Sequence, residues 1–347
     1  MRRVLGGRHA LLGAGIVLVA AFAIFAVLIL AEDDPPAIAE EELPAGCQPG
    51  LPHITCTYTS STRFSFDSMV SQLESAYERQ IGSSTPVWVQ AWGGRGAKGA
   101  TWEGYSGAYG GYAGYAISVQ SVGDLGGKTL YLYVGANGSK HANYSGQGGA
   151  SSIVSTQPVS QGGAFPGGLI AVAAGSGGGG KAGEECWTGR GGNGGVAIAT
   201  GQNVGGSGQN GDGPTQGWGG YGGQGGAGGG TAGTTGANGT GGYGGAGNSA
   251  GSPAGWVNVE AVDPAAAGWN AGAGGEGRGG GGGGGYGGGG GGGECKWVAK
   301  AENAINGGGG GGASWALGNA VGDSGAPTDS RQADGVSSKI VLTIDVS

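Results

Sequence analysis

One serine of this chain lies in a string that could supply a catalytic nucleophile. Residues 322–327 read GDSGAP, with Ser324 at the centre, and His53 and His141 lie upstream as candidate bases. A serine nucleophile depends on a positioned histidine that accepts its proton. Only 22 residues follow Gly325, and short strings of Gly, Ser and Asp arise readily in a chain with 94 glycines. We therefore interpret GDSGAP as a turn before a last strand and expect no enzymatic activity.

Four cysteines form a second set of reactive side chains, and an even number allows three pairings. We favour Cys47 with Cys56, across the turn QPGLPHIT, and Cys186 with Cys295, which lie in the similar contexts GEECW and GECKW. Zinc sites need closely spaced cysteine and histidine ligands, whereas this chain has no CxxC string and its histidines lie elsewhere. We expect two disulfides, no metal site and no cofactor.

A group of aromatic residues, spaced mainly by three and four with glycine between them, could bind a ligand. Tyrosine and tryptophan offer a large contact area with a polar edge, so these rings could form a sugar-binding or protein-binding surface. Alternatively, they cover bare glycine backbone as part of the core, and this is the interpretation that we favour. The residues are Trp102, Tyr105, Tyr109, Tyr112 and Tyr115.

The elements that must position these residues are dominated by glycine. Residues 218–229 read WGGYGGQGGAGG, with a side chain at every third position. Three residues per turn is the repeat of an extended left-handed helix, and glycine lets such helices approach backbone to backbone. Collagen shares this period, but no proline lies between Pro214 and Pro253, which argues against a triple helix. A disordered low-complexity tract remains the alternative, although the interleaved aromatic residues favour order.

The N-terminus predicts a location outside the cytoplasm. Residues 10–31 form an apolar run long enough to cross a bilayer, with three arginines before it and acids after it, so residues 1–9 are expected in the cytoplasm. Residues 32–45 read as an acidic, proline-containing stalk, and residues 46–347 as an extracellular domain. A cleaved signal peptide, leading to secretion, is the alternative. Removing three basic residues from a net charge of −7 leaves −10 outside, which disfavours nucleic acid as a partner.

Patterns of apolar residues predict a mainly β domain with one short helix. Alternation and β-branched or aromatic residues predict strands, and spacing of three and four predicts a helix over Asp67–Gln80, capped by Asp67 and stopped at Gly82. The string GDLGGKT at 123–129 is expected to form a hairpin turn. The closing strand is expected to pair with an early strand, so that the glycine tracts, mainly 175–312, form an insertion. The expected strands are 55–66, 86–92, 112–122, 128–134, 169–174 and 338–346.

The order of these segments resembles a known family. AWGGRGAKGA, GYAGYAISVQS, KTLYLYVGANG, LIAVAAGSGGGG, the glycine tracts and a closing SKIVLTIDV occur in sequence. This order is similar to the glycine-rich domain of bacterial surface proteins, phage tail-tip adhesins and the anaplastic lymphoma kinase family of receptors. The resemblance covers about residues 55–347. It implies an antiparallel, jelly-roll-like β-sandwich carrying a bundle of polyglycine type II helices.

These observations lead us to expect a membrane-tethered extracellular binding or adhesion module whose rigid glycine-rich scaffold displays recognition loops. Its partners would be the membrane, through residues 10–31, and an extracellular protein or glycan. A structural cell-envelope or matrix protein without a specific ligand is the first alternative. A secreted serine hydrolase that uses Ser324 is the second.

Overall fold

The computed structural model describes most of the chain between Leu43 and Val346 and separates it from a first unit, Met1–Glu42. The apolar run 10–31, the stalk up to residue 42, Cys186, Cys295 and Ser324 lie outside the described residues. No helix of the described part is long and apolar enough to cross a membrane. The described ranges are 43–101, 103–140, 146–159, 168–182, 187–198, 204–206, 283–286, 305–306, 308–318 and 338–346.

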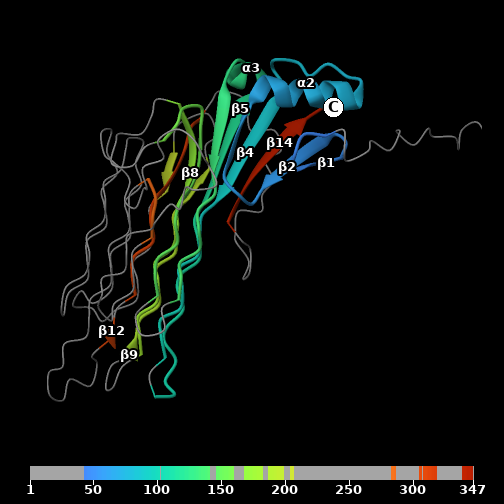
Figure 1. The fold of residues 1–347 in the computed structure, drawn as a ribbon. Coiled ribbons are helices and arrows are strands. Elements are labelled where there is room, and N and C mark those ends of the chain that lie inside the picture. The colour runs from blue at the N-terminus through green and yellow to red at the C-terminus, as the bar shows by residue number, and fades with distance from the viewer. Residues whose placement is uncertain are drawn as a thin grey trace, which may run out of the picture. The chain divides into compact units, whose positions relative to one another are not determined.

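Two six-stranded sheets form the mainly β body of the second unit (Figure 1). Most strand pairs are antiparallel, as expected, but β10 (Val196–Ile198) pairs with β5 (Tyr115–Ser121) in parallel. The short strands β9 (Trp187–Thr188) and β12 (Ile305–Asn306) also pair in parallel. The first sheet has the order β1 (Cys47–Gln48), β2 (His53–Tyr58), β14 (Lys339–Asp345), β4 (Pro86–Trp92), β5 (Tyr115–Ser121), β10 (Val196–Ile198). The second has the order β11 (Val204–Gly206), β13 (Ser314–Ala316), β8 (Leu169–Ala173), β7 (Ser152–Ser155), β6 (Thr129–Tyr133), β3 (Thr62–Ser65).

The two sheets pack against each other through apolar residues and two buried serine hydroxyls. Strands β4, β5 and β8 are rich in valine, isoleucine and alanine, and nearly all of their residues are buried. The Ser152 hydroxyl donates to the Trp92 carbonyl at 2.6 Å, and the Ser118 hydroxyl donates to the Leu317 carbonyl at 2.6 Å. Since a buried hydroxyl without a partner is costly, these contacts fix how the sheets face each other.

The C-terminal strand confirms the expectation that it returns to early strands. Strand β14 lies between β2 and β4, and Leu342 is the register partner of Cys56 on one side and of Val89 on the other. The expected disulfide is present in the same sheet, where Cys47 and Cys56 are partners in the β1–β2 pair.

The segment 55–66 is not one strand, as the alternation predicted. It contains β2 in the first sheet and β3 in the second, with a bend at 59–60 between them. Polar Ser60 and Ser61 leave no apolar side chain to hold a continuous strand there, and the Ser61 hydroxyl instead accepts a hydrogen bond from the Val134 amide. One predicted strand therefore serves both sheets.

The helix α2 (Phe66–Tyr77) begins and ends earlier than its predicted bounds. Ser65, not Asp67, is the N-cap, since its hydroxyl accepts from the Ser68 amide. The helix stops at a left-handed Glu78 with φ 51°, four residues before Gly82. Its spacing of apolar residues holds as predicted, because Phe66, Met69, Val70 and Leu73 are buried.

The connection 122–128 is not the expected hairpin turn. It contains a single helical turn, α3 (Val122–Leu125), closed by a capping box between Ser121 and Asp124. It joins β5 of the first sheet to β6 of the second. The glycines of this string indicate a break between two strands, but they do not indicate that the second strand, β6, belongs to the other sheet. Asp67 ties this connection to α2, because its carboxylate accepts from the Gly127 amide.

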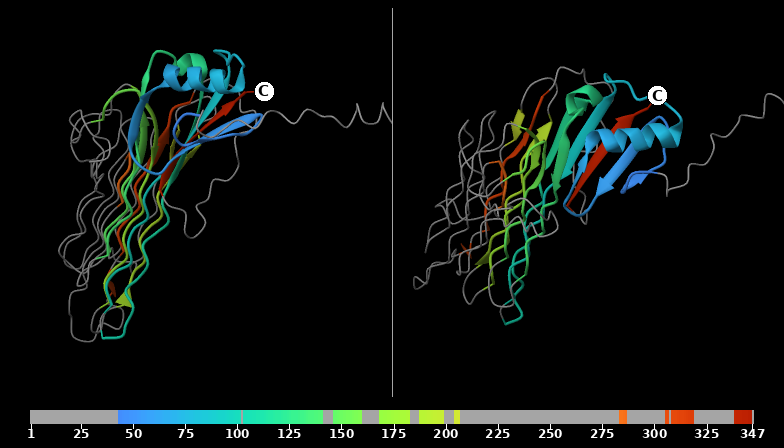
Figure 2. Two further views of the ribbon diagram at one scale, coloured as in Figure 1. Left: turned by 45° about the vertical axis from the view of Figure 1, so that its right-hand side comes forward. Right: turned by 45° about the horizontal axis from the view of Figure 1, so that its top comes forward.

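Glycine-rich segments continue the strands beyond the sheets, as the coloured ribbons of Figure 2 show. The connections β4 to β5, β6 to β7 and β8 to β10 each run out as one segment and return as another. We call the hydrogen-bonded set the glycine array. Its described segments are 93–101, 105–114, 135–140, 146–151, 174–182, 189–195, 283–286 and 308–313.

Candidate functional surface

The segment 174–182 lies at the centre of the glycine array and forms backbone hydrogen bonds with six other segments. One bond to each neighbour, with N to O distances of 2.8 to 3.2 Å, establishes this arrangement. The bonds run from Ser176 to Gly94, from Gly177 to Gly192, from Gly175 to Gly284, from Gly111 to Gly177, from Gly149 to Ser176 and from Gly312 to Gly175.

Where several bonds join segment 174–182 to one neighbour, they recur at every third residue. Toward the segment 93–101, the amides of Ser176, Gly179 and Ala182 donate to the carbonyls of Gly94, Ala97 and Ala100. In a β-sheet the side chains alternate with a period of two, and hydrogen bonds reach neighbours on two sides only. A period of three with neighbours on all sides indicates an extended backbone with three residues per turn.

Glycine is required at the centre because three successive residues each face a different backbone. A Cβ atom on Gly177, Gly178 or Gly179 would collide with the carbonyl oxygen of Gly309, Gly146 or Ala108, respectively. No side chain could be accommodated without separating the segments. The main chain therefore takes the part that apolar side chains take in an ordinary core.

The outer segments 93–101 and 105–114 carry side chains that form a surface. Arg95 and Lys98 are three residues apart on one segment, and Tyr109 and Tyr112 are three apart on the antiparallel neighbour. The Arg95 guanidinium carbon lies 5.3 Å from the centroid of the Tyr112 ring. The Lys98 ammonium lies 4.6 Å from the centroid of the Tyr109 ring. We call these four residues the tyrosine–cation face.

The rings of this surface are exposed, contrary to the expectation that they form core. Tyr105, Tyr109 and Tyr112 are 71%, 56% and 41% exposed. The expectation holds for Tyr115, which begins β5, is buried, and accepts a hydrogen bond from the Gln90 amide group at 2.8 Å. Trp102 lies outside the described residues. Tyr115 lies three residues after Tyr112, but it stands in β5, where its ring packs against the Trp92 ring with 4.9 Å between the ring centroids, whereas the exposed rings lie beyond the sheet.

Two asparagines hold the backbone of this face. The Asn137 side-chain oxygen accepts from the Arg95 amide, and the Asn193 side-chain oxygen accepts from the Tyr112 amide, both at 2.8 Å. Arg95 and Tyr112 are the members of one cation–ring pair, so each is fixed through its main chain by a neighbouring segment. Lys98 is fixed at its tip, since its ammonium donates to the Ser106 hydroxyl at 2.6 Å.

The charge of the described array differs in sign from that of the chain. Its described segments and their turn at 101–105 contain five basic residues and a single acid, Glu103, while the whole chain has a net charge of −7. Local positive potential on an acidic protein attracts anions to that place. The basic residues are Arg95, Lys98, Lys140, Lys181 and Arg190.

Sequence reasoning missed the cations and the two asparagines. Arg95 and Lys98 lie in GGRGAKGA, where the same three-residue period that marks the glycine tracts also separates the two charges. This signal was available. Nothing in the sequence identifies Asn137 and Asn193 as backbone acceptors, because they come from distant connections.

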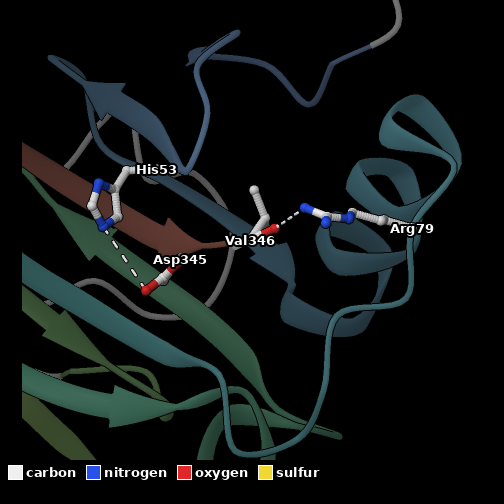
Figure 3. Close-up of polar contacts among 4 residues, drawn as sticks. All are labelled: His53, Arg79, Asp345 and Val346. Atoms are coloured by element: carbon white, nitrogen blue, oxygen red, sulfur yellow. Dashed lines mark hydrogen bonds and ion pairs between the residues drawn. The ribbon is translucent and has the colours of Figure 1, made fainter. Parts of the chain in front are cut away.

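His53, a candidate base for Ser324, lies at the start of β2 (Figure 3). Its Nε2 atom is 3.9 Å from Asp345 Oδ2, across the β2–β14 pair, and its ring packs edge-on against Trp88. Arg79 of the loop after α2 donates from Nη1 to the Val346 carbonyl at 2.6 Å and so fastens the end of β14. His141 and Ser324 lie outside the described residues.

Among the described residues, no group of three or more His, Cys, Asp or Glu side chains is placed to hold a metal ion. A scan against models of known protein families finds no match, and a search of curated proteins finds no relative.

Proposed function

We propose that this chain is a membrane-tethered extracellular binding or adhesion module. In this proposal residues 10–31 are the anchor, residues 32–45 the stalk, and the exported domain is a β-sandwich of the glycine-rich type. The glycine array is its scaffold, and the tyrosine–cation face is its recognition surface. The observation that carries the proposal is this exposed face on a hydrogen-bonded support.

The scaffold is proposed to be a bundle of polyglycine type II helices. Support comes from the six neighbours of segment 174–182 and from the recurrence of its hydrogen bonds at every third residue. Helices joined in this way share their backbone bonds in several directions, so bending one helix strains its neighbours. Rigid support matters for binding, because ordering a flexible surface on contact weakens affinity.

Exposed tyrosines favour recognition over a purely structural role. A tyrosine ring has few rotatable bonds, a large apolar area and a polar edge, and for these reasons it is enriched at binding hot spots. An array that served only as a spacer would be equally well held by alanine at these positions, since Ala97 and Ala100 already lie in the neighbouring segment. The presence of tyrosine at positions 109 and 112 therefore favours a role in binding a partner.

The test is binding of the full-length chain, solubilised in neutral detergent, to arrays of glycans and extracellular proteins. We expect saturable binding to a small set of ligands. The double variant Tyr109→Ala/Tyr112→Ala should lose it while keeping the thermal midpoint within a few degrees, because both side chains are exposed. Lys128→Ser, an exposed change in the connection 122–128, is the control and should bind like the parent chain.

Absence of saturable binding would favour the structural envelope protein instead. Equal binding by the tyrosine variant would contradict the assignment of recognition to the tyrosine–cation face.

A further inference from the structure

We infer that the ligand of the tyrosine–cation face is an anionic polysaccharide. This inference rests on the proposed function and adds the chemical class of the partner. Three features of the described residues support it: the pairing of each ring with a cation, the repeat of this pair along the array, and the positive charge of the array.

Each ring of the face has a cation over one of its two sides. Arg95 lies with Tyr112 and Lys98 with Tyr109, at 5.3 and 4.6 Å from the ring centroids. An acidic sugar presents the matching pair of groups, since the C–H face of its ring packs on an aromatic ring while its carboxylate or sulfate lies at the ring edge. The sugar would occupy the side of the aromatic ring opposite the cation, and the long side chain of the cation would reach past the ring edge to form a charge-assisted hydrogen bond with that acid.

The pairs repeat along a straight support. Three residues at 3.1 Å rise separate successive positions of one side by about 9 Å, a length comparable to that of a disaccharide. A polymer with a regular repeat can thus meet both pairs at once, and simultaneous contacts raise the overall affinity. Tyr105, which is 71% exposed, lies further along the same segment.

The sign of the charge selects an anion. Five basic residues and one acid occupy the described array, so an acidic polymer is attracted to it, whereas the acidic remainder of the chain repels that polymer. An acidic peptide shares the charge but has no flat apolar face to place on successive rings. Single-stranded nucleic acid also has a flat group and a negative charge, but its phosphate is separated from the stacking base by the sugar, whereas an acidic sugar carries its acid on the ring that stacks.

The decisive experiment is calorimetric titration of the full-length chain in neutral detergent with two anionic glycans, a polygalacturonate decamer and chondroitin sulfate. Polygalacturonate whose carboxylates are methyl-esterified is the matched uncharged ligand. Polyglutamate and oligothymidylate test the other polyanions. We expect binding of at least one anionic glycan, weakened by added salt, and no binding of the ester or of the other polyanions.

Variants separate the rings from the charges. Tyr109→Ala/Tyr112→Ala and Arg95→Gln/Lys98→Gln should each weaken binding by about tenfold or more. Tyr109→Phe/Tyr112→Phe keeps the rings and should restore affinity. The charge variant should also bind with a weaker dependence on salt. Lys128→Gln, an exposed cation outside the array, should change affinity by less than twofold.

The inference is overturned if neither anionic glycan binds, if the ester binds equally, or if polyglutamate or oligothymidylate binds as tightly. The results that would overturn this inference can be distinguished from those that would overturn the proposed function. Saturable binding of an uncharged ligand that depends on Tyr109 and Tyr112 would keep the module and remove the acidic glycan. Absence of any ligand that depends on the face would remove both.

Discussion

Buried and half-buried tyrosines give the folded chain a measurable response to alkaline pH. Burial raises the pKa of Tyr58 and of Tyr286 to about 12, and burial is also the main cause of the raised pKa of Tyr133. Tyr58 donates to the Met69 sulfur at 3.9 Å, and Tyr286 stacks on Trp315. The neutral phenol suits these surroundings, whereas a phenolate there would lose its hydration.

This difference predicts loss of stability at high pH. In the unfolded chain a tyrosine has a pKa near 10, so the folded state holds the proton more tightly. The contribution is fully present below pH 10 and is lost as pH rises from about 10 to about 12. Urea unfolding at a series of pH values should show the midpoint falling across this range, and Tyr58→Phe should make the fall shallower. An unchanged pH profile in Tyr58→Phe would contradict the assignment to this residue.

At the scale of a single element, segment 174–182 is held by its neighbours on every side, and a Cβ on Gly175, Gly177, Gly178 or Gly179 would collide with a backbone carbonyl. Gly178→Ala would push a methyl group into the Gly146 carbonyl, and we expect it to lower the free energy of unfolding by about 3 kcal/mol or to prevent folding. Gly82→Ala is the matched control, because its Cβ would be 3.8 Å from the nearest atom. The thermal unfolding midpoints of both variants should be measured and compared with that of the parent chain. Equal midpoints would show that the array accommodates a methyl group at Gly178 and would contradict the prediction.

Elements with a side-chain pattern were predictable from sequence, and those fixed by neighbours were not. The bounds of β4 match the prediction, and those of β5, β6, β8 and β14 lie within the predicted ranges, because their β-branched and aromatic residues are bounded by breaks in the pattern. The division of 55–66 between two sheets depends on tertiary contacts that no local pattern records. For the same reason the sequence identified the five aromatic residues but not which of them are buried. Tyr109 and Tyr115 share the three-residue period, and only the place of Tyr115 in β5, packed against Trp92, separates it from exposed Tyr109.

For the molecule as a whole, the glycine array is expected to be as well protected as the sheets. Amides such as those of Gly177 and Gly180 donate to carbonyls of a neighbouring segment and are buried. Hydrogen exchange of the full-length chain should therefore show slow exchange for peptides covering 174–182, comparable to that for β8. The exposed turn at Gly104 should exchange within the dead time. Fast exchange across 174–182 would mean that the array opens independently of the sheets.

The place of β14 also governs when the chain can fold. Strand β14, residues 339–345, pairs with both β2 and β4 and so joins them. Both of these strands lie more than 240 residues earlier in the sequence. Contacts of such separation form slowly, and here they cannot form until β14 has been synthesised. A chain that crosses a membrane from its N-terminus would present β2 and β4 on the far side with an open gap between them. If the chain is exported as we propose, the facing edges of β2 and β4 would stay unpaired during that interval and would need protection from aggregation and proteolysis.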